Sequence, residues 1–136
     1  MEIQTEVFGK IEISEEQVIS FAEGLSKVKT VCEYVLLPVE DELLYCLQAK
    51  DYPEVSFFVI DPFVVTKDFR LQVDTEELLT VGCESDVLPE SVLVLCPFIK
   101  GNAAGDFNVD FQSPILINRL LRLGKQLKNR WVYQSK

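Results

Sequence analysis

The chain has 136 residues, of which 48% are apolar, and carries 22 acidic against 13 basic residues, a formal net charge of -9 at pH 7. This length suits one domain with its own core, and the apolar fraction excludes an intrinsically disordered protein. There is no histidine, so the familiar serine and cysteine catalytic triads cannot be assembled and no zinc site can be completed by histidine.

Alternating apolar residues predict a β-hairpin at the start of the chain. Between residues 2 and 13 apolar side chains fall mostly on odd positions, and Gly9 stands in the middle as the turn residue. Ser14 and Gln17 then have the spacing of a capping box, which predicts one helical turn. A strand follows this turn, and Gly24 ends the segment.

Three short apolar runs predict three strands of a sheet. They cover residues 31–39, 43–48 and 55–60, and the turns between them are charged or contain proline. Residues 69–73 alternate apolar and polar side chains, the pattern of a strand with one buried and one wet face. We expect the charge of this segment on its outer face.

The next part of the chain predicts one more helical turn and two more strands. Residues 75–79 are typical of a short capped helix, with acids in its first turn where they favour the positive end of the helix dipole. We expect this acidic turn to be exposed. Residues 91–98 predict an apolar strand, 101–105 a loop of small residues, and 107–111 an alternating strand.

The final stretch allows two interpretations. Leucines spaced for a basic amphipathic helix are preceded by Pro114 and interrupted by Gly124. Residues 115–117 and 127–132 also suit a pair of strands, with a looser turn over 118–125. We favour the strand pair. Together these elements, and the frequency of Val, Ile, Phe and Tyr, predict a β-rich protein.

Charge is divided unequally along the chain. Residues 1–110 hold all 22 acids and 7 bases, a net charge of -15, whereas the last 26 residues hold 6 bases and no acid. Such an asymmetry favours an acidic face that attracts a basic or amphipathic protein and repels polyanions. We therefore expect no direct binding of nucleic acid.

No motif for a cofactor, metal or nucleotide is found in the sequence. The four cysteines lack any Cys-x-x-Cys spacing; they are Cys32, Cys46, Cys83 and Cys96. Because the acidic amino terminus is no signal peptide, we interpret these cysteines as structural thiols in a reducing cytosol. The glycines are dispersed and form no phosphate-binding loop. The longest apolar run, residues 92–99, is too short to span a membrane.

Two segments resemble signatures of the flagellar assembly factor FliW. Residues 57–63 read Phe-Phe-Val-Ile-Asp-Pro-Phe, and residues 112–118 read Gln-Ser-Pro-Ile-Leu-Ile-Asn, with Gly-Lys-Gln following at 124–126. The Leu-Gln pair at 47–48, the Ile-Ser-Phe-Ala-Glu-Gly-Leu segment at 19–25 and the total length agree with the family. The resemblance covers nearly the whole chain.

Two loops depart from the family's pattern. Residues 26–29 read Ser-Lys-Val-Lys where the family continues with Pro-Gly-Phe-Glu, and residues 107–111 replace its usual Thr-Ala-Asn-Leu. These loops could recognise a different partner. The sequence leaves open whether the altered loop of residues 26–30 retains regulator binding.

The resemblance implies an all-β fold, a small barrel-like antiparallel sheet with one or two short helical turns, in a single domain over residues 1–136. It implies a monomer of the bacterial cytoplasm that is no enzyme and needs no cofactor. Its partners would be flagellin and the RNA-binding translational regulator CsrA. In the family, free FliW captures CsrA and relieves its repression of flagellin mRNA, while newly made flagellin occupies FliW, so that synthesis follows export.

Acidic side chains are our candidates for the regulator contact, since they could dock a basic protein and repel RNA phosphates from it. Ordinary solubilising acids are the alternative interpretation. The candidates are Asp61, Asp74, Glu76, Glu77, Glu84 and Asp86.

We expect flagellin to bind an apolar surface, because the terminal segments of flagellins are amphipathic helices. Phe63, beside Pro62 at a strand end, is the candidate, and a core role is its alternative. Asn118, Lys125 and Gln126 lie in the matched motifs and are candidates for binding or for turn geometry.

A second class of function stays open at this stage, a ligand-binding or hydrolytic β-barrel that uses a buried carboxylate. Asp61, Asp68 and Asp74 flank predicted strands and could supply it. A deep polar pocket with a desolvated carboxylate would favour this alternative. A barrel interior filled with side chains, and charges only outside, would favour a binding protein.

Overall fold

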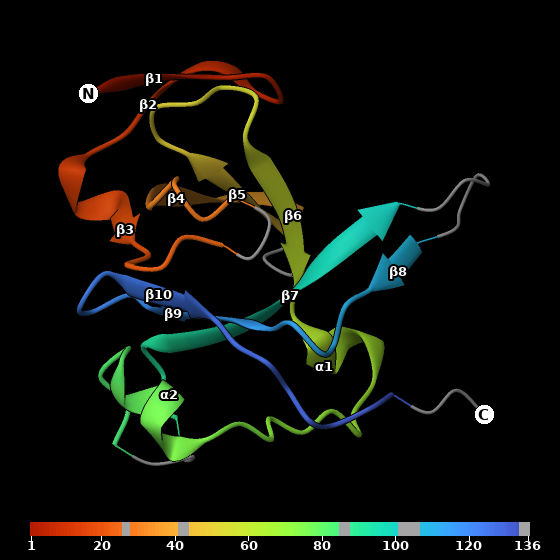
Figure 1. Ribbon diagram of the computed structural model, residues 1–136. Coiled ribbons are helices and arrows are strands. Elements are labelled where there is room, and N and C mark those ends of the chain that lie inside the picture. The colour runs from red at the N-terminus through yellow and green to blue at the C-terminus, as the bar shows by residue number, and fades with distance from the viewer. Residues whose placement is uncertain (26–27, 41–43, 85–87, 101–106, 134–136) are drawn as a thin grey trace.

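Seven strands close into a barrel, and an eighth extends one of them (Figure 1). The computed structural model describes residues 1–25, 28–40, 44–84, 88–100 and 107–133. Around the barrel the order is β6-β5-β4-β3-β10-β9-β7, and pairing of β6 with β7 closes it. The strands are β3 (Val18–Ser20), β4 (Glu33–Glu40), β5 (Leu44–Ala49), β6 (Ser56–Ile60), β7 (Val92–Lys100), β8 (Phe107–Val109), β9 (Ile115–Asn118) and β10 (Leu123–Gln126). The predicted all-β, barrel-like fold is confirmed.

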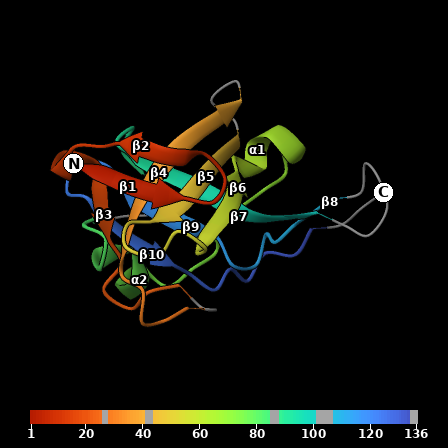
Figure 2. The ribbon, with the colours of Figure 1, turned by 90° about the horizontal axis from the view of Figure 1, so that it is seen from above.

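The predicted opening hairpin is confirmed as well, and it covers one side of the barrel (Figure 2). β1 (Glu2–Thr5) pairs antiparallel with β2 (Gly9–Glu12). Gly9 has φ +71° at the turn, a conformation that glycine adopts without steric cost. Ile3 packs with Val35 of β4, so the hairpin buries the outer face of that strand.

The capping box also forms where it was predicted. The backbone N–H of Ser14 donates to Oε1 of Gln17 over 2.8 Å, which closes the single turn of η1 (Glu15–Gln17). β3 follows directly and pairs with β4. The segment ends in a turn at Gly24, whose φ is +64° and where any side chain would collide with the backbone of Lys29.

The three apolar runs in the first half of the chain form β4, β5 and β6, an antiparallel meander. The run predicted over 91–98 forms β7, which pairs with β9 through its first half and with β6 and β8 further on. The loop predicted over 101–105 lies outside the described residues. β8 is shorter than the predicted strand, because Phe111 turns away into an aromatic cluster.

Apolar side chains fill the barrel interior. Phe21, Leu47 and Ile117 are fully buried there among neighbours from every side of the sheet. Phe21 meets the ring of Tyr34 edge to face at 5.4 Å between centroids. This filled interior is the observation that favours a binding protein over a barrel with an internal ligand site.

Gly124 lets β10 approach the largest of these side chains. A Cβ at this position would overlap the Phe21 ring, and the glycine itself is buried. The glycine of the Gly-Lys-Gln motif is therefore required by packing. Contact with an aromatic ring, rather than an unusual backbone angle, requires the glycine.

The predicted strand over residues 69–73 is wrong, although its alternation is right. Phe69 is buried and Arg70 exposed, as the pattern requires. No described strand pairs with this segment, which accepts one backbone hydrogen bond from the Arg130 N–H at the Gln72 carbonyl. Its backbone is instead held by the side chain of Asn129, whose Oδ1 accepts from the Gln72 N–H at 2.6 Å and whose Nδ2 donates to the Arg70 carbonyl at 2.9 Å.

A strand pair near the carboxyl terminus is confirmed, but the predicted position of its second strand is wrong. β9 pairs with β10, which begins at Leu123 rather than at residue 127. Asn118 explains the shorter turn, because its Oδ1 accepts from the N–H groups of Leu120 and Leu121 at 3.2 and 3.1 Å. Residues 127–132 follow outside the assigned strands, and Leu127 and Asn129 donate backbone hydrogen bonds to the carbonyls of Pro114 and Gln112.

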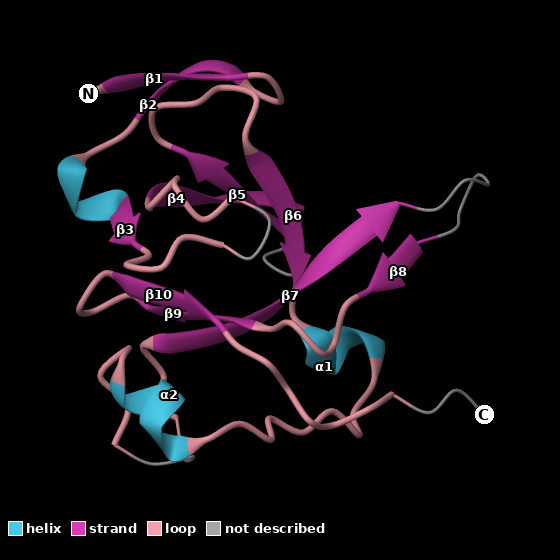
Figure 3. Cartoon of the chain, viewed as in Figure 1, coloured by secondary structure: helices cyan, strands magenta, loops and turns pink. Residues whose placement is uncertain are grey.

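Helical turns are few and lie outside the barrel (Figure 3). α2 (Thr75–Leu79) confirms the predicted acidic turn. α1 (Pro62–Val65) was not predicted, although Asp61 as N-cap and Pro62 at the first helical position are its signal: Asp61 Oδ1 accepts from the Phe63 N–H at 2.9 Å. Neither described α-helix is long and apolar enough to cross a membrane.

Replacement of Gly124 by alanine should destabilise the fold by about 1–3 kcal/mol, because the new methyl group overpacks the Phe21 ring. Urea unfolding followed by tryptophan fluorescence measures the change. In a Phe21→Leu background the same Gly124→Ala change should cost less, since the smaller side chain leaves room. Equal costs in both backgrounds would show that the ring contact is not the cause.

Candidate functional site

Five aromatic rings from four separate segments form one cluster beside the barrel. Phe69 lies at its centre, 5.4 Å from Phe63 of α1 and 5.3 Å from Trp131, with both pairs edge to face. Phe111 joins Trp131 at 5.7 Å and Tyr133 at 5.0 Å. Each such pair contributes about 0.5–1.5 kcal/mol beyond its buried area, so the cluster fixes the carboxyl-terminal segment on α1 and β8.

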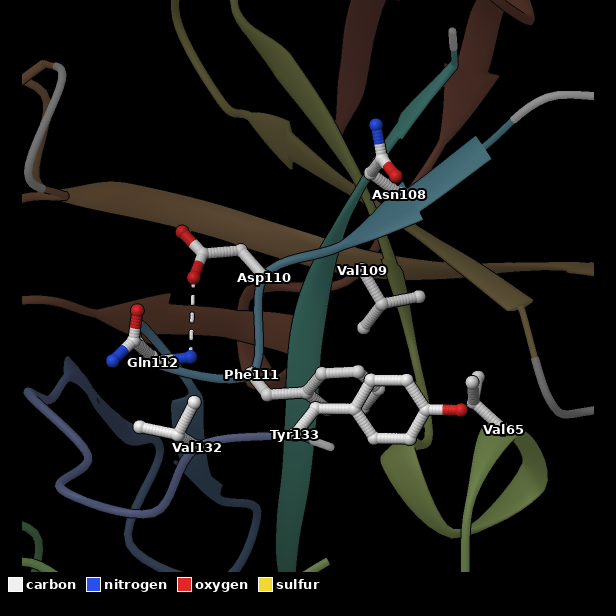
Figure 4. A pocket seen from close by; sticks show the side chains of 8 residues that line it. All are labelled: Val65, Asn108, Val109, Asp110, Phe111, Gln112, Val132 and Tyr133. Atoms are coloured by element: carbon white, nitrogen blue, oxygen red, sulfur yellow. Dashed lines mark hydrogen bonds between the residues drawn. The ribbon is translucent and has the colours of Figure 1, made fainter. Parts of the chain in front are cut away.

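A hollow of about 320 Å³ opens over this cluster (Figure 4). The Tyr133 ring lies beside Phe111 and forms its floor, and polar side chains stand at its other edge. There the Asp110 carboxylate accepts from the backbone N–H of Gln112 at 3.1 Å. The lining residues are Val65, Asn108, Val109, Asp110, Phe111, Gln112, Val132 and Tyr133.

Phe63 is half exposed, at 52% of its surface, rather than buried in the core. One edge of its ring packs on Phe69 and the rest faces solvent. Val64, Val132 and Tyr133 are exposed to a similar degree, between 42% and 57%. Phe63 is joined to Tyr133 through the rings of Phe69 and Trp131, and exposed apolar side chains that gather in this way are typical of a docking site.

Most of the predicted acidic candidates gather around α2. Asp74 is the N-cap residue of this helix, and Glu76 and Glu77 lie in its first turn. Glu84 follows the helix and is exposed. Asp74 pairs with Arg130 at 2.9 Å. Asp61 lies apart from this group, at the start of α1, and Asp86 lies outside the described residues.

Lys125 bridges two acids with a largely buried side chain. Its Nζ lies 3.2 Å from Glu77 and 3.4 Å from Glu23. Burial alone would lower the pKa of Lys125, but the hydrogen bonds and charges of Glu77 and Glu23 outweigh it and raise the pKa above its ordinary value. The ion pairs thus tie β10 to α2 and to the turn before Gly24.

Asn118 and Gln126 use their side chains inside the protein. Asn118 is 4% exposed, and its Nδ2 donates to the Val81 carbonyl at 2.8 Å while its Oδ1 closes the β9–β10 turn. Gln126 Nε2 donates to the Ser113 carbonyl at 3.0 Å. The geometry of these motif residues matches the alternative that they serve turn and strand structure.

The cysteines are unpaired, and three of them are buried. Burial raises the pKa of the Cys46 and Cys83 thiols. Burial, followed by the charges of Asp110 and Asp61, raises the pKa of Cys96 to about 12. These three side chains are therefore neutral thiols at physiological pH and act as apolar packing groups.

A buried carboxylate, which the enzyme or ligand-barrel alternative needs, is not found among the described residues. The buried polar side chains there are those of Thr5, Gln48, Asn118 and Asn129. All four are uncharged. A polar hollow of about 650 Å³ beside α2 is lined by Asp74 among others, but the Asp74 side chain is 73% exposed, so this hollow does not hold the desolvated carboxylate that the alternative needs.

A family model described as FliW protein matches residues 2–132. The chain belongs to the FliW family. It is 32% identical over 131 residues to the flagellar assembly factor FliW of Leptospira interrogans, covering 96% of this chain and 86% of that protein. It is 34% identical to the FliW of Geobacillus kaustophilus, covering 93% and 86%.

The fold is shared with this family as well. A crystal structure of the flagellar assembly factor FliW superposes with a TM-score of 0.82 at 28% identity, covering all of this chain and 94% of the other. The segments that carried the sequence resemblance have structural reasons in this fold. Asn118 shapes a turn and Gly124 packs on Phe21, so FliW motifs at these positions specify the barrel.

Sequence reasoning missed the carboxyl-terminal half of the hollow. Trp131 and Tyr133 alternate with Val132 in a segment that was predicted only as a strand. The chain has one tryptophan, and its position two residues from a tyrosine near the end of the chain was a usable signal. The hollow could not be predicted, because its parts come together only through the fold.

Removal of the Lys125 charge by Lys125→Met should lower stability at neutral pH, because Glu77 and Glu23 lose their shared partner. The folded pKa of Lys125 is raised, so its contribution is complete below the ordinary lysine value of about 10.4 and is lost as pH rises through the folded pKa. The difference in unfolding free energy between wild type and variant should therefore disappear in strong alkali.

Unfolding free energies at a series of pH values measure this difference. Lys128→Met is the matched control, since Lys128 is exposed and pairs with no described carboxylate. It should cost less than the Lys125 change at neutral pH. A difference for Lys125→Met that stays constant to the highest pH would contradict the ion-pair explanation.

Proposed function

We propose that this chain is a cytoplasmic, monomeric binding protein that couples flagellin synthesis to flagellum assembly. It binds flagellin as a chaperone and antagonises the translational regulator CsrA, without binding nucleic acid itself. The observation that carries this proposal is the match to the FliW family over residues 2–132, with relatives whose name is flagellar assembly factor. The filled barrel interior is consistent with a function on the outer surface.

The acids around α2 form the surface that we assign to the regulator. Glu77 and Asp74 are partly neutralised by Lys125 and Arg130, whereas Glu76 and Glu84 pair with no described base. Unpaired exposed carboxylates give the strongest local field, which steers a basic partner and speeds its association. The same field repels RNA phosphates, so a captured regulator would be kept from its message.

Flagellin, in this proposal, uses a different and apolar surface. An exposed aromatic patch suits an amphipathic helix, whose stability in complex comes from burial of its apolar face. Phe63 belongs to such a patch. Regulator and flagellin would then be recognised by different physical interactions, the first sensitive to salt and the second largely insensitive.

Reversal of two acids on the regulator surface tests this assignment. Glu76→Lys with Glu84→Lys should slow association with purified CsrA by about tenfold at low salt and flatten the dependence of the rate on salt, because steering depends on the local field. Stopped-flow or surface plasmon resonance measures both.

The matched control reverses Asp51 and Glu54, which are exposed in the turn between β5 and β6. It changes the net charge by the same amount, so an equal effect of both double variants would assign the steering to total charge and not to α2. Wild-type protein that binds neither CsrA nor the flagellin of its own organism would overturn the proposed function as a whole.

A further inference from the structure

Large exposed apolar side chains of the described residues occur at several places, including Val7 and Phe8 at the β1–β2 turn, and two of these places adjoin depressions in the surface. One is the hollow beside α1, which Val132 and Tyr133 line. Phe63 does not line it but is joined to Tyr133 through the rings of Phe69 and Trp131.

The other place is the β9–β10 turn, where Leu120 is 79% exposed next to Leu121. The depression that Leu121 itself lines consists mainly of charged and polar residues. A second depression beside the turn contains Leu36, Tyr45 and Leu93, but neither Leu120 nor Leu121 lines it.

The hollow beside α1 is built before any partner arrives. Its floor rests on Phe111, which is buried and held by Trp131 and Tyr133. Asn129 adds a hydrogen bond from Nδ2 to the Phe111 carbonyl at 3.1 Å. A preformed apolar surface binds more tightly than a flexible one, because less side-chain entropy is lost on binding.

Size and charge limit what can occupy the hollow. A volume of about 320 Å³ is at the small end for a ligand pocket and suits one or two inserted side chains. Asp110 is the one charged residue among those that line it, and it forms no ion pair with a described base. The occupant should therefore present apolar side chains with a basic residue beside them.

An α-helix fits these limits better than an added β-strand. β8 borders the hollow through Asn108, but it has only three residues, so an extended peptide would gain few backbone hydrogen bonds along it. A helix needs only anchors on one face, spaced three or four residues apart.

We propose that the hollow between α1 and the carboxyl-terminal segment is the flagellin contact, and that it receives the apolar anchors of an amphipathic helix whose flanking lysine or arginine pairs with Asp110. This inference rests on the proposed function in one respect, that the chain binds flagellin. It adds the surface, the conformation of the bound segment and the charge beside its apolar face.

Two single substitutions of equal chemistry separate the two exposed surfaces. Val132→Asp places a charge in the hollow, and Leu120→Asp places the same charge on the β9–β10 turn; both positions are more than half exposed, so neither change should unfold the barrel. Val132→Asp should weaken binding of purified flagellin by tenfold or more, as expected for the centre of an interface, while Leu120→Asp changes it less than about twofold. Thermal unfolding of each variant checks the fold.

Asp110→Asn tests the charge. It should weaken flagellin binding by several-fold and reduce the sensitivity to salt, because an ion pair is replaced by an uncharged contact. CsrA binding serves as a second readout and should be unchanged by all three variants. This readout also shows that a loss of flagellin binding is not a loss of folded protein.

The possible outcomes distinguish failure of this inference from failure of the proposed function. Wild type that binds flagellin, with Val132→Asp binding equally well, would overturn the inference and leave the proposed function standing. Leu120→Asp as the damaging change would move the contact to the β9–β10 turn and likewise overturn it. Wild type without any affinity for flagellin would overturn both.

Discussion

The buried amide of Asn129, together with the backbone N–H groups of Asn129 and Arg130, holds together three stretches of chain that lie outside the described strands. Its oxygen accepts from Gln72, and its nitrogen donates to the carbonyls of Arg70 and Phe111. All of its hydrogen-bonding groups are satisfied at 5% exposure, a situation in which loss of the partner leaves buried backbone groups unpaired. The aromatic cluster and the hollow above it exist because these stretches meet.

The barrel itself acts as a rigid support rather than as a container. Its interior is packed with apolar side chains, and the features that suit partners lie on short helical turns and terminal segments outside it. α1 and α2 are connected by the segment that Asn129 anchors. In both views the two helices stand at separate positions on the molecule, so the two proposed partners would meet separate surfaces (Figures 1 and 2).

Local signals were sufficient for the elements whose hydrogen bonds are local. Gly9 and the Ser14–Gln17 spacing predicted the hairpin and the helical turn, and alternating burial predicted which side of residues 69–73 faces the core. The sequence-based prediction failed where the backbone forms hydrogen bonds with a side chain instead of with a neighbouring strand. Asn129 and Asn118 do this at positions 57 and 37 residues away from their partners, Gln72 and Val81, which no local pattern contains.

The site was predicted in part for a similar reason. The acidic candidates around α2 are neighbours in sequence, so their grouping on one turn follows from the chain itself. Phe63, a candidate from the sequence, is exposed, but Tyr133 lies some seventy residues away near the other end of the chain and is joined to it through Phe69 and Trp131. Family resemblance predicted the barrel and is the source of the proposed partners, but it did not predict this surface.

Methyl NMR of the protein during titration with its flagellin tests the central claim most directly. Val65, Val109 and Val132 report on the hollow, and Leu120 and Leu121 report on the exposed β9–β10 turn in the same spectrum. The account predicts large shifts of the three valines and little change of the two leucines. Shifts confined to the leucines, or to methyl groups of neither surface, would contradict it.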